Sequence, residues 1–219
     1  MNKTKTFIFD LDGVIVDTAK YHFLAWRKLA HEIGIHFTPE HNEQLKGVSR
    51  VRSLDIILGL GSVETSQEQK NIWLQQKNED YLSYLTEVDE GEILPGVMTV
   101  LLYLKEQKQN IVLGSASKNA KPILEKTKII HLFDAIVDGN DVSNAKPDPE
   151  VFLQGAQKVG ADAKDCIVFE DSVAGIQAAN IASMVSVGIG ENSVLHEANF
   201  IFPDFTHIDL QFIDNLIQN

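Results

Sequence analysis

Cysteine is almost absent from this chain, which has Cys166 alone among 219 residues. A single thiol excludes an internal disulfide framework and suits a reducing cytosol. No apolar run reaches the roughly 18–20 residues needed to span a bilayer. The apolar stretch behind the N-terminal lysines stops at Asp10, which is too short for a signal peptide. These absences predict a soluble cytoplasmic protein.

Basic residues are few relative to acidic ones. Nineteen Lys and Arg stand against thirty-one Asp and Glu, for a net charge of -12. Such a surface repels a nucleic-acid backbone and an anionic membrane unless basic residues gather at one spot. We therefore expect no nucleic-acid or membrane partner. We also expect a monomer whose partners are small-molecule sugar phosphates. The length allows one large domain, or a core with a smaller insert.

Short apolar runs rich in β-formers alternate with helical patterns along most of the chain. The runs cover residues 6–9, 111–113, 135–137, 167–169 and 185–187. Apolar residues at helical spacing follow Pro95-Gly96, Pro149 and Ser172. This alternation is typical of βαβ units, so we predict an α/β fold whose open parallel sheet is covered on both faces.

The stretch from about Val14 to Leu94 breaks that rhythm. Its apolar residues follow helical spacing throughout, and Ser66 opens a capping-box signature before a long helical pattern. No strand pattern interrupts these helices. We interpret the stretch as a helical insert after the first strand, with the acidic segment 87–92 as its second hinge.

Polar side chains follow the ends of the predicted strands. In open α/β sheets ligands collect beyond the carboxyl ends of the strands, so these side chains are expected at one edge. They comprise four carboxylates, one hydroxyl and one ammonium: Asp10, Asp12, Ser115, Lys146, Glu170 and Asp171.

This combination of groups suits phosphoryl transfer. Carboxylates at such density repel one another unless a cation lies among them, and oxygen ligands suit Mg²⁺. The hydroxyl and the ammonium suit a phosphoryl group, because both donate hydrogen bonds. A carboxylate facing phosphorus can act as nucleophile. A second carboxylate two residues further on can carry a proton to or from the leaving oxygen.

Each segment taken alone also has a structural explanation. Asp10-Leu11-Asp12-Gly13 fits a turn, because Asp-Gly is a common turn dipeptide. Glu170 and Asp171 precede a predicted helix, where acids are favourable, and Lys146 fits a solvated loop lysine. The coincidence of all these positions at one sheet edge favours a site.

In order along the chain, Asp10-Leu11-Asp12-Gly13-Val14, Ser115, Lys146 and Glu170-Asp171 resemble the four motifs of the haloacid dehalogenase superfamily of phosphotransferases. The resemblance implies a Rossmannoid parallel core, residues 1–15 and 93–219, with a small α-helical cap, residues 16–92, inserted after the first strand. It implies Asp10 as nucleophile and Asp12 as general acid/base. Mg²⁺ would be held by Asp10, the Asp12 carbonyl and Asp171, with Glu170 nearby.

Three segments, residues 12–26, 45–50 and 115–119, resemble the β-phosphoglucomutase family within that superfamily. This implies an isomerase that interconverts β-D-glucose 1-phosphate and D-glucose 6-phosphate. The route would pass through an aspartyl phosphate and β-D-glucose 1,6-bisphosphate, which also serves as primer. The implied substrate-binding residues are Thr18, His22, Trp26, Lys46, Gly47, Val48, Ser49, Arg50, Ser53, Lys77, Ser115, Ala116, Ser117, Lys118, Asn119 and Lys146.

A mutase needs two phosphate sites, one at the metal and one that grips the phosphate that is not reacting. Arg and hydroxyl or amide donors suit the second site, and Arg50 with residues 117–119 would supply them. For three cap residues a plain structural role competes: His22 as a semi-buried side chain, Trp26 as core packing, and Lys77 as a solvated lysine.

Two other functions compete with the mutase. A sugar-phosphate or phosphoglycolate phosphatase would use the same core and release inorganic phosphate, without need of the Arg50 grip. A non-catalytic phosphoprotein, similar to receiver domains, would share the acidic cluster and the lysine. Receiver domains lack a helical insert after the first strand, and Asp12 would have no task in them.

Overall fold

A computed structural model describes residues 4–218; residues 1–3 and 219 of the expected core lie outside this range. One sheet of six parallel strands has the order β3-β2-β1-β4-β5-β6. The strands are β1 (Thr6–Phe9), β2 (Asn110–Gly114), β3 (Ala135–Val137), β4 (Cys166–Glu170), β5 (Val185–Ile189) and β6 (Phe200–Phe202). The predicted α/β class is confirmed.

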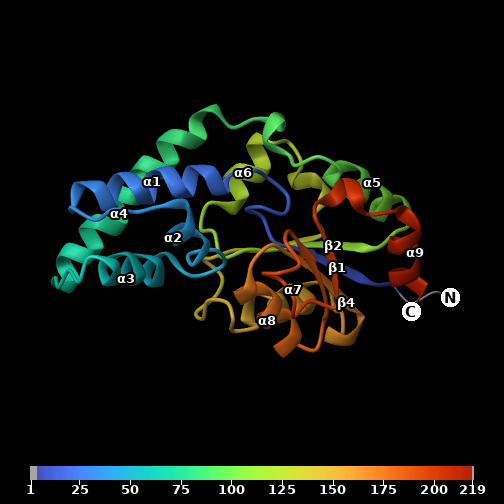
Figure 1. Ribbon diagram of the computed structural model, residues 1–219. Helices are drawn as coiled ribbons and strands as arrows, with labels where there is room; N and C mark the ends of the chain where they lie inside the picture. The colour runs from blue at the N-terminus through green and yellow to red at the C-terminus, as the bar shows by residue number, and fades with distance from the viewer. Residues whose placement is uncertain (1–3, 219) are drawn as a thin grey trace.

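Nine α-helices are present among the described residues (Figure 1). They are α1 (Ala19–Glu32), α2 (Pro39–Glu43), α3 (Arg50–Leu60), α4 (Gln67–Tyr84), α5 (Val97–Glu106), α6 (Ala120–Lys126), α7 (Glu150–Lys158), α8 (Val173–Ile181) and α9 (Leu210–Gln218). Within residues 4–218 none of them has the length and apolarity that crossing a membrane requires.

The alternation of side chains along β1 assigns the two faces of the sheet. Phe7 and Phe9 belong to an apolar cluster with residues of α5, α6 and α9, whereas Ile8 belongs to a second cluster with residues of α7 and α8. The two helical layers lie on opposite sides of the sheet in Figure 1. All three β1 side chains are fully buried, and burial of one such side chain contributes about 1.5–3 kcal/mol.

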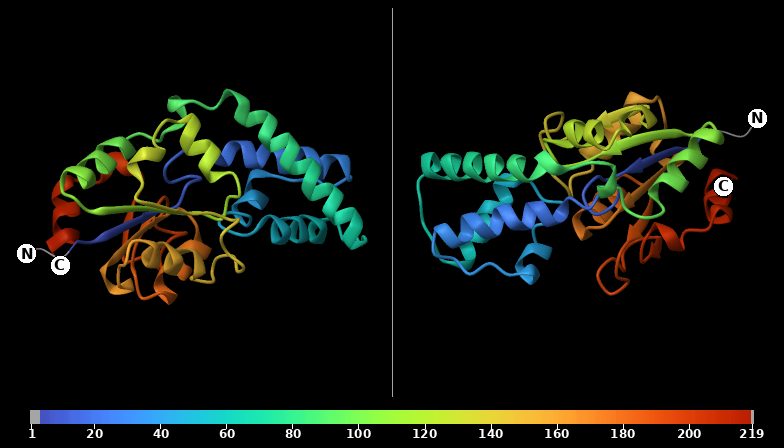
Figure 2. Two further views of the ribbon diagram at one scale, coloured as in Figure 1. Left: turned by 180° about the vertical axis from the view of Figure 1, so that it is seen from behind. Right: turned by 90° about the horizontal axis from the view of Figure 1, so that it is seen from above.

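Helices α1 to α4 form a separate body, here called the cap, beyond the carboxyl ends of the strands (Figure 2). The cap has its own apolar cluster, which includes Trp26, Leu29, Leu54 and Ile57. The two chain segments that join it to the sheet lie side by side, since Val16 forms an antiparallel bridge with Ile93. The cap therefore lies over the sheet edge at which the polar motifs were expected.

The predicted acidic hinge, residues 87–92, begins at the last residue of one short 3₁₀ turn, η1 (Leu85–Glu87), and contains a second, η2 (Glu90–Glu92). Glu92 ties this segment to the start of α1: Tyr21 Oη donates to its carboxylate at 2.7 Å, and Lys20 Nζ lies 2.7 Å from it. The two linkers are thus held together by side chains as well as by the backbone bridge.

Candidate functional site

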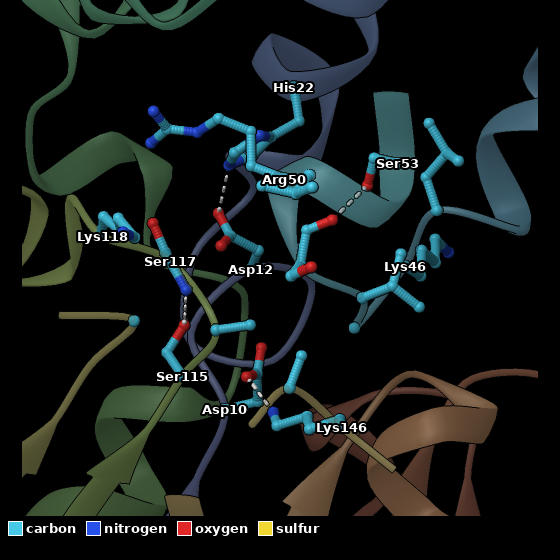
Figure 3. A pocket seen from close by; sticks show the side chains of 18 of the residues that line it. Asp10, Asp12, His22, Lys46, Arg50, Ser53, Ser115, Ser117, Lys118 and Lys146 are labelled. Carbon is cyan, nitrogen blue, oxygen red and sulfur yellow. Dashed lines mark hydrogen bonds and ion pairs between the residues drawn. The ribbon is translucent and has the colours of Figure 1, made fainter. Parts of the chain in front are cut away.

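A cavity of about 570 Å³ lies between the cap and the carboxyl ends of the strands (Figure 3). Its size suits a small ligand. The predicted site residues that line it are Asp10, Asp12, His22, Trp26, Lys46, Gly47, Val48, Ser49, Arg50, Ser53, Lys77, Ser115, Ala116, Ser117, Lys118, Lys146 and Asp171. Three predicted residues do not line the cavity: Thr18, Asn119 and Glu170. Each forms a hydrogen bond with a residue that does line it.

Lys146 links two carboxylates beneath the cavity floor. Its Nζ lies 2.5 Å from Asp10 Oδ1 and also pairs with Glu170, and all three groups are buried. Burial lowers the pKa of Lys146, but the charges of Asp10 and Glu170 outweigh it, so the lysine stays charged. Burial raises the pKa of Asp10 to about 7, and the charges of Glu170 and Asp12 add to this, while Lys146 opposes it.

Glu170, the last residue of β4, forms an ion pair with Lys146 and holds it in place. Its second oxygen accepts hydrogen bonds from the backbone N–H and the hydroxyl of Ser172, at 2.9 and 2.8 Å. Ser172 is the N-cap of α8, and its hydroxyl also accepts from Gly175 N–H at 3.1 Å. Both Glu170 oxygens are thus engaged inside the protein, which fixes Lys146 beside Asp10.

Asp12 lies two residues beyond Asp10 and is held from the cap side. The Thr18 hydroxyl donates to its carboxylate, and His22 Nε2 lies 3.8 Å from the same oxygen. Burial raises the pKa of Asp12, and the hydrogen bond from Thr18 opposes the shift. A carboxyl with a raised pKa is suited to carry a proton. The buried Thr18 therefore acts on Asp12 and not on the cavity.

Lys77, expected as a solvated lysine on sequence grounds alone, is 1% exposed. Its Nζ lies 2.8 Å from His22 Nδ1 and close above the rings of Trp26 and Tyr81. Burial lowers its pKa to about 7, and the charge of Arg50 adds to this. Burial also lowers the pKa of His22, with Lys77 contributing, so the imidazole is neutral at pH 7. Its Nδ1 accepts from Lys77, which leaves Nε2–H facing Asp12.

The loop after β2 forms a chain of short contacts along the core side of the cavity. Ser115 Oγ accepts from Ser117 N–H at 3.1 Å, and Ser117 Oγ accepts from Asn119 N–H at 3.3 Å. The side-chain amide of Asn119 donates to Asn78 Oδ1 of the cap at 3.3 Å. The loop thus bonds to the cap and presents its hydroxyls beside Lys118, as expected for a phosphate-binding loop.

Arg50 enters the same cavity from the first residue of α3. Ser49 caps this helix by accepting from Arg52 N–H at 3.3 Å, and Ser53 Oγ donates to the Ser49 carbonyl at 3.1 Å. Burial lowers the pKa of the Arg50 guanidinium, and among residues 4–218 no carboxylate lies within ion-pair distance of it. A partly buried cation without a counter-charge suits an anionic ligand.

The donor set beside Asp10 fits Mg²⁺. Asp171, the residue after β4, also lines the cavity, and burial raises its pKa strongly, with the charges of Glu170 and Asp10 adding to the shift. Crowded, buried carboxylate oxygens are stabilised by a hard divalent cation. Within the described part of the chain, no three His, Cys, Asp or Glu side chains form a ready-made cage.

Some lining residues carry no motif and were not predicted. From the cap they include Asn42, Val51 and Leu74; from the core they include Gly139, Val142 and Ser143. The apolar cap residues follow the same helical spacing as core residues, so only the tertiary arrangement distinguishes them. The spacing of Tyr81 is likewise that of a core residue, so the sequence does not predict the stacking of its ring on His22, with 4.0 Å between centroids.

A family model described as haloacid dehalogenase-like hydrolase matches residues 4–182. The chain belongs to this family. The matched range includes Asp10, Asp12, Lys146 and Asp171.

Two relatives narrow the comparison within the haloacid dehalogenase-like family. The chain is 40% identical to a β-phosphoglucomutase of Bacillus subtilis over 211 aligned residues. The alignment covers 95% of this chain and 93% of that one. The chain is 33% identical over 182 residues to a fructose-1-phosphate phosphatase of Escherichia coli, covering 83% of this chain and 94% of that one.

A solved structure is similar to this chain along almost its whole length. The crystal structure of a β-phosphoglucomutase from Clostridium difficile superposes with a TM-score of 0.93 at 42% identity, and covers 98% of this chain and 97% of that one. The similarity therefore includes both the sheet and the cap.

Proposed function

We propose that this chain is a β-phosphoglucomutase that interconverts β-D-glucose 1-phosphate and D-glucose 6-phosphate. The observation that carries the proposal is that Arg50 of the cap and Lys118 of the core line the same cavity as Asp10. A phosphatase needs one phosphate site, whereas a mutase needs a second, cationic site away from the nucleophile. The 40% identity to the Bacillus subtilis mutase supports the same choice.

In the proposed reaction an Asp10 oxygen attacks the phosphorus of β-D-glucose 1,6-bisphosphate, which also serves as primer. The bond from phosphorus to the sugar oxygen breaks as the aspartyl phosphate forms, and Asp12 gives its proton to the leaving oxygen. The glucose 6-phosphate formed leaves, and β-D-glucose 1-phosphate binds. In the return step its 6-hydroxyl gives a proton to Asp12 and attacks the aspartyl phosphate, which re-forms the bisphosphate and frees Asp10. The bisphosphate then turns end for end, so that its 1-phosphate faces Asp10. Lys146 and Ser115 hold the phosphoryl oxygens throughout.

Asp10, the Asp12 backbone carbonyl and Asp171 would hold Mg²⁺, with Glu170 behind them. When bound, Mg²⁺ neutralises the charge on the transferring phosphoryl group. The cap residues bind the remainder of the substrate: Arg50 takes the distal phosphate, while Trp26, Val48 and Ser53 face the sugar. A grip shared by cap and core uses remote binding energy to close the cavity, which limits the access of water to the aspartyl phosphate.

The closed cavity depends on two bodies, and we propose their bounds as residues 1–15 with 93–219 for the core and 16–92 for the cap. The Val16–Ile93 bridge at their junction supports these bounds. We also propose a cytoplasmic monomer that binds sugar phosphates and no nucleic acid, since the net charge is -12 and the single cysteine is buried.

The test offers the purified protein β-D-glucose 1-phosphate, MgCl₂ and a trace of the bisphosphate. Glucose 6-phosphate is followed with a coupled dehydrogenase, and free phosphate is measured in parallel. Isomerisation that greatly outpaces phosphate release is expected. Release that outpaces isomerisation would replace the mutase with a sugar-phosphate phosphatase, the activity named for the 33% identical relative of Escherichia coli.

The distal phosphate site is tested by Arg50→Ala. This change should reduce mutase turnover far more than phosphorylation of Asp10 by acetyl phosphate, because that small donor has no distal phosphate. Arg27→Ala is a suitable control, since Arg27 of α1 is an exposed cap arginine that does not line the cavity. Equal losses in the two assays for Arg50→Ala would exclude the distal role.

A further inference from the structure

Lys46 reaches from the cap to a core carboxylate. It lies in the loop between α2 and α3, and its Nζ is 2.9 Å from Glu43 Oε2 on its own side. The same nitrogen is 3.8 Å from Asp171 Oδ2, across the junction with the core. The family resemblance implies substrate contact for Lys46, but both ion-pair partners of its ammonium among residues 4–218 are carboxylates of the protein.

Lys46 and Asp171 also separate two cavities. Both residues line the cavity that holds Asp10 and Arg50, and both line a neighbouring cavity of about 790 Å³. The second cavity lies against the last part of the core, with Glu191 and Phe205 among its lining residues. The pair therefore stands at the wall between the substrate cavity and this outer cavity, and so at the boundary of the proposed metal site.

The charge of Lys46 occupies a position that matters to a metal. Asp171 is crowded by the negative charges of Asp10 and Glu170, and Lys146 is already committed to those two carboxylates. Lys46 is the cation that the cap brings to Asp171. A divalent ion at Asp171 and an ammonium about 4 Å from the same oxygen repel each other, so each weakens the binding of the other.

We propose that Lys46 is a positioning residue that acts as a tethered counter-ion of Asp171 and competes with Mg²⁺ for it. In the metal-free enzyme the Lys46–Asp171 pair holds the cap loop against the core. Binding of Mg²⁺ weakens this pair and releases the loop that carries Gly47 to Arg50. Thermodynamic linkage makes this effect reciprocal: the factor by which Mg²⁺ weakens the Lys46–Asp171 pair is the factor by which the pair weakens Mg²⁺ binding. Removing the ammonium should therefore strengthen Mg²⁺ binding by that factor. This inference rests on the proposed magnesium site.

The test is isothermal titration of MgCl₂ into the substrate-free full-length protein. Lys46→Met should bind Mg²⁺ roughly five- to ten-fold more tightly than wild type, the range expected for a partly buried charge pair. Lys46→Arg keeps the charge and should stay near the wild-type affinity. Lys28→Met is the matched control, because Lys28 is a cap lysine paired with Asp80 at 2.5 Å and lines neither cavity.

A second variant separates the tether from general electrostatics. Glu43→Gln removes the partner that draws Lys46 away from Asp171, so Mg²⁺ binding should weaken. If Lys46 transmits this effect, most of it disappears when Glu43→Gln is made in the Lys46→Met background. An equal loss in both backgrounds would show that Glu43 acts on the metal directly and would overturn the tether.

The two proposals fail in different ways. If wild type binds Mg²⁺ and Lys46→Met binds it no more tightly, the competition is excluded while the metal site stands. If wild type takes up no Mg²⁺, the metal site falls, and the inference falls with it. Thermal unfolding of each variant checks that the chain is folded before titration.

Discussion

The ammonium of Lys77 lies 2.8 Å from Nδ1 of His22, and Nε2 of the same ring lies 3.8 Å from the Asp12 carboxylate. The three groups come from α4, α1 and the loop after β1, so this arrangement exists only while cap and core are in contact. A neutral imidazole between an amine and a carboxylate holds Asp12 toward the cavity. In the proposed reaction, the cap thus positions the acid/base Asp12.

Lys77→Met should make the protein more stable relative to wild type as the pH falls. Burial lowers the folded-state pKa of Lys77 to about 7, below its ordinary value of 10.5. Between these values unfolding takes up a proton, so wild-type stability declines as pH drops from about 10 to about 7, by up to about 1.4 kcal/mol per pH unit. Urea unfolding at several pH values measures the gap between variant and wild type.

The gap should widen from pH 10 to pH 7 and stay constant below that. Lys28→Met, at an exposed lysine of the cap, should show no such widening. A gap that does not change with pH would mean that Lys77 is charged in the folded protein across this range. Mutase turnover of Lys77→Met should fall in any case, because His22 loses the donor that fixes its tautomer.

Thr18→Val should lower kcat with little change in KM. The Thr18 hydroxyl donates to Asp12 and does not line the cavity, so its loss affects the acid/base and not substrate contact. A hydrogen bond to a charged group is worth about 1.5–3 kcal/mol, which predicts a loss of roughly ten- to one-hundred-fold. Thr127→Val is the control, since the Thr127 hydroxyl is equally buried and bonds only to α6 carbonyls. A rise in KM alone would place Thr18 in substrate binding.

The residues at the strand ends could be predicted from the sequence because two independent features point to the same place. Each polar motif directly follows a buried apolar run, and parallel strands bring their carboxyl ends to one edge. Asp10, Ser115 and Asp171 therefore lie where the sequence predicts them. The five predicted strands are confirmed. The insert between β1 and β2 is helical, as its apolar spacing predicts.

The rest depended on contacts that no local pattern encodes. Helix α2 is only five residues long, so it offers no helical period to detect, and β6 is a three-residue strand at the edge of the sheet. The burial of Lys77 follows from Trp26 and Tyr81, which approach it only after α1 packs on α4. The pairing of Lys46 with Asp171 joins two residues far apart in the chain, so the sequence could place Lys46 in the loop but not identify its partner.

Lys146→Met should destabilise the protein strongly, and Mg²⁺ should reverse part of the loss. Removing the ammonium leaves Asp10 and Glu170 buried without their counter-charge, which costs about 3–5 kcal/mol. At the proposed metal site, Mg²⁺ would supply positive charge beside Asp10. Urea unfolding with and without MgCl₂ should show a larger metal effect in the variant than in wild type. Lys5→Met, at a buried lysine paired with Asp165, should lose less stability and gain no extra response; an equal response in both would exclude the link to the metal.

The position of Glu170, which pairs with Lys146, also depends on Gly175 of α8. Substitution of this glycine therefore tests whether Glu170 holds Lys146 in place. Gly175 lies in α8 where a Cβ would overlap the Glu170 carboxylate, whereas a Cβ at Gly59 of α3 would meet nothing within 4 Å. Alanine is the better helix former by about 1 kcal/mol, so Gly59→Ala should raise the free energy of unfolding by about that amount. Gly175→Ala should lower it by about 2 kcal/mol or more and reduce turnover, because displacing Glu170 moves Lys146 away from Asp10. Urea unfolding and the coupled assay measure both, and a neutral or stabilising Gly175→Ala with full activity would show that Glu170 does not hold Lys146 in place.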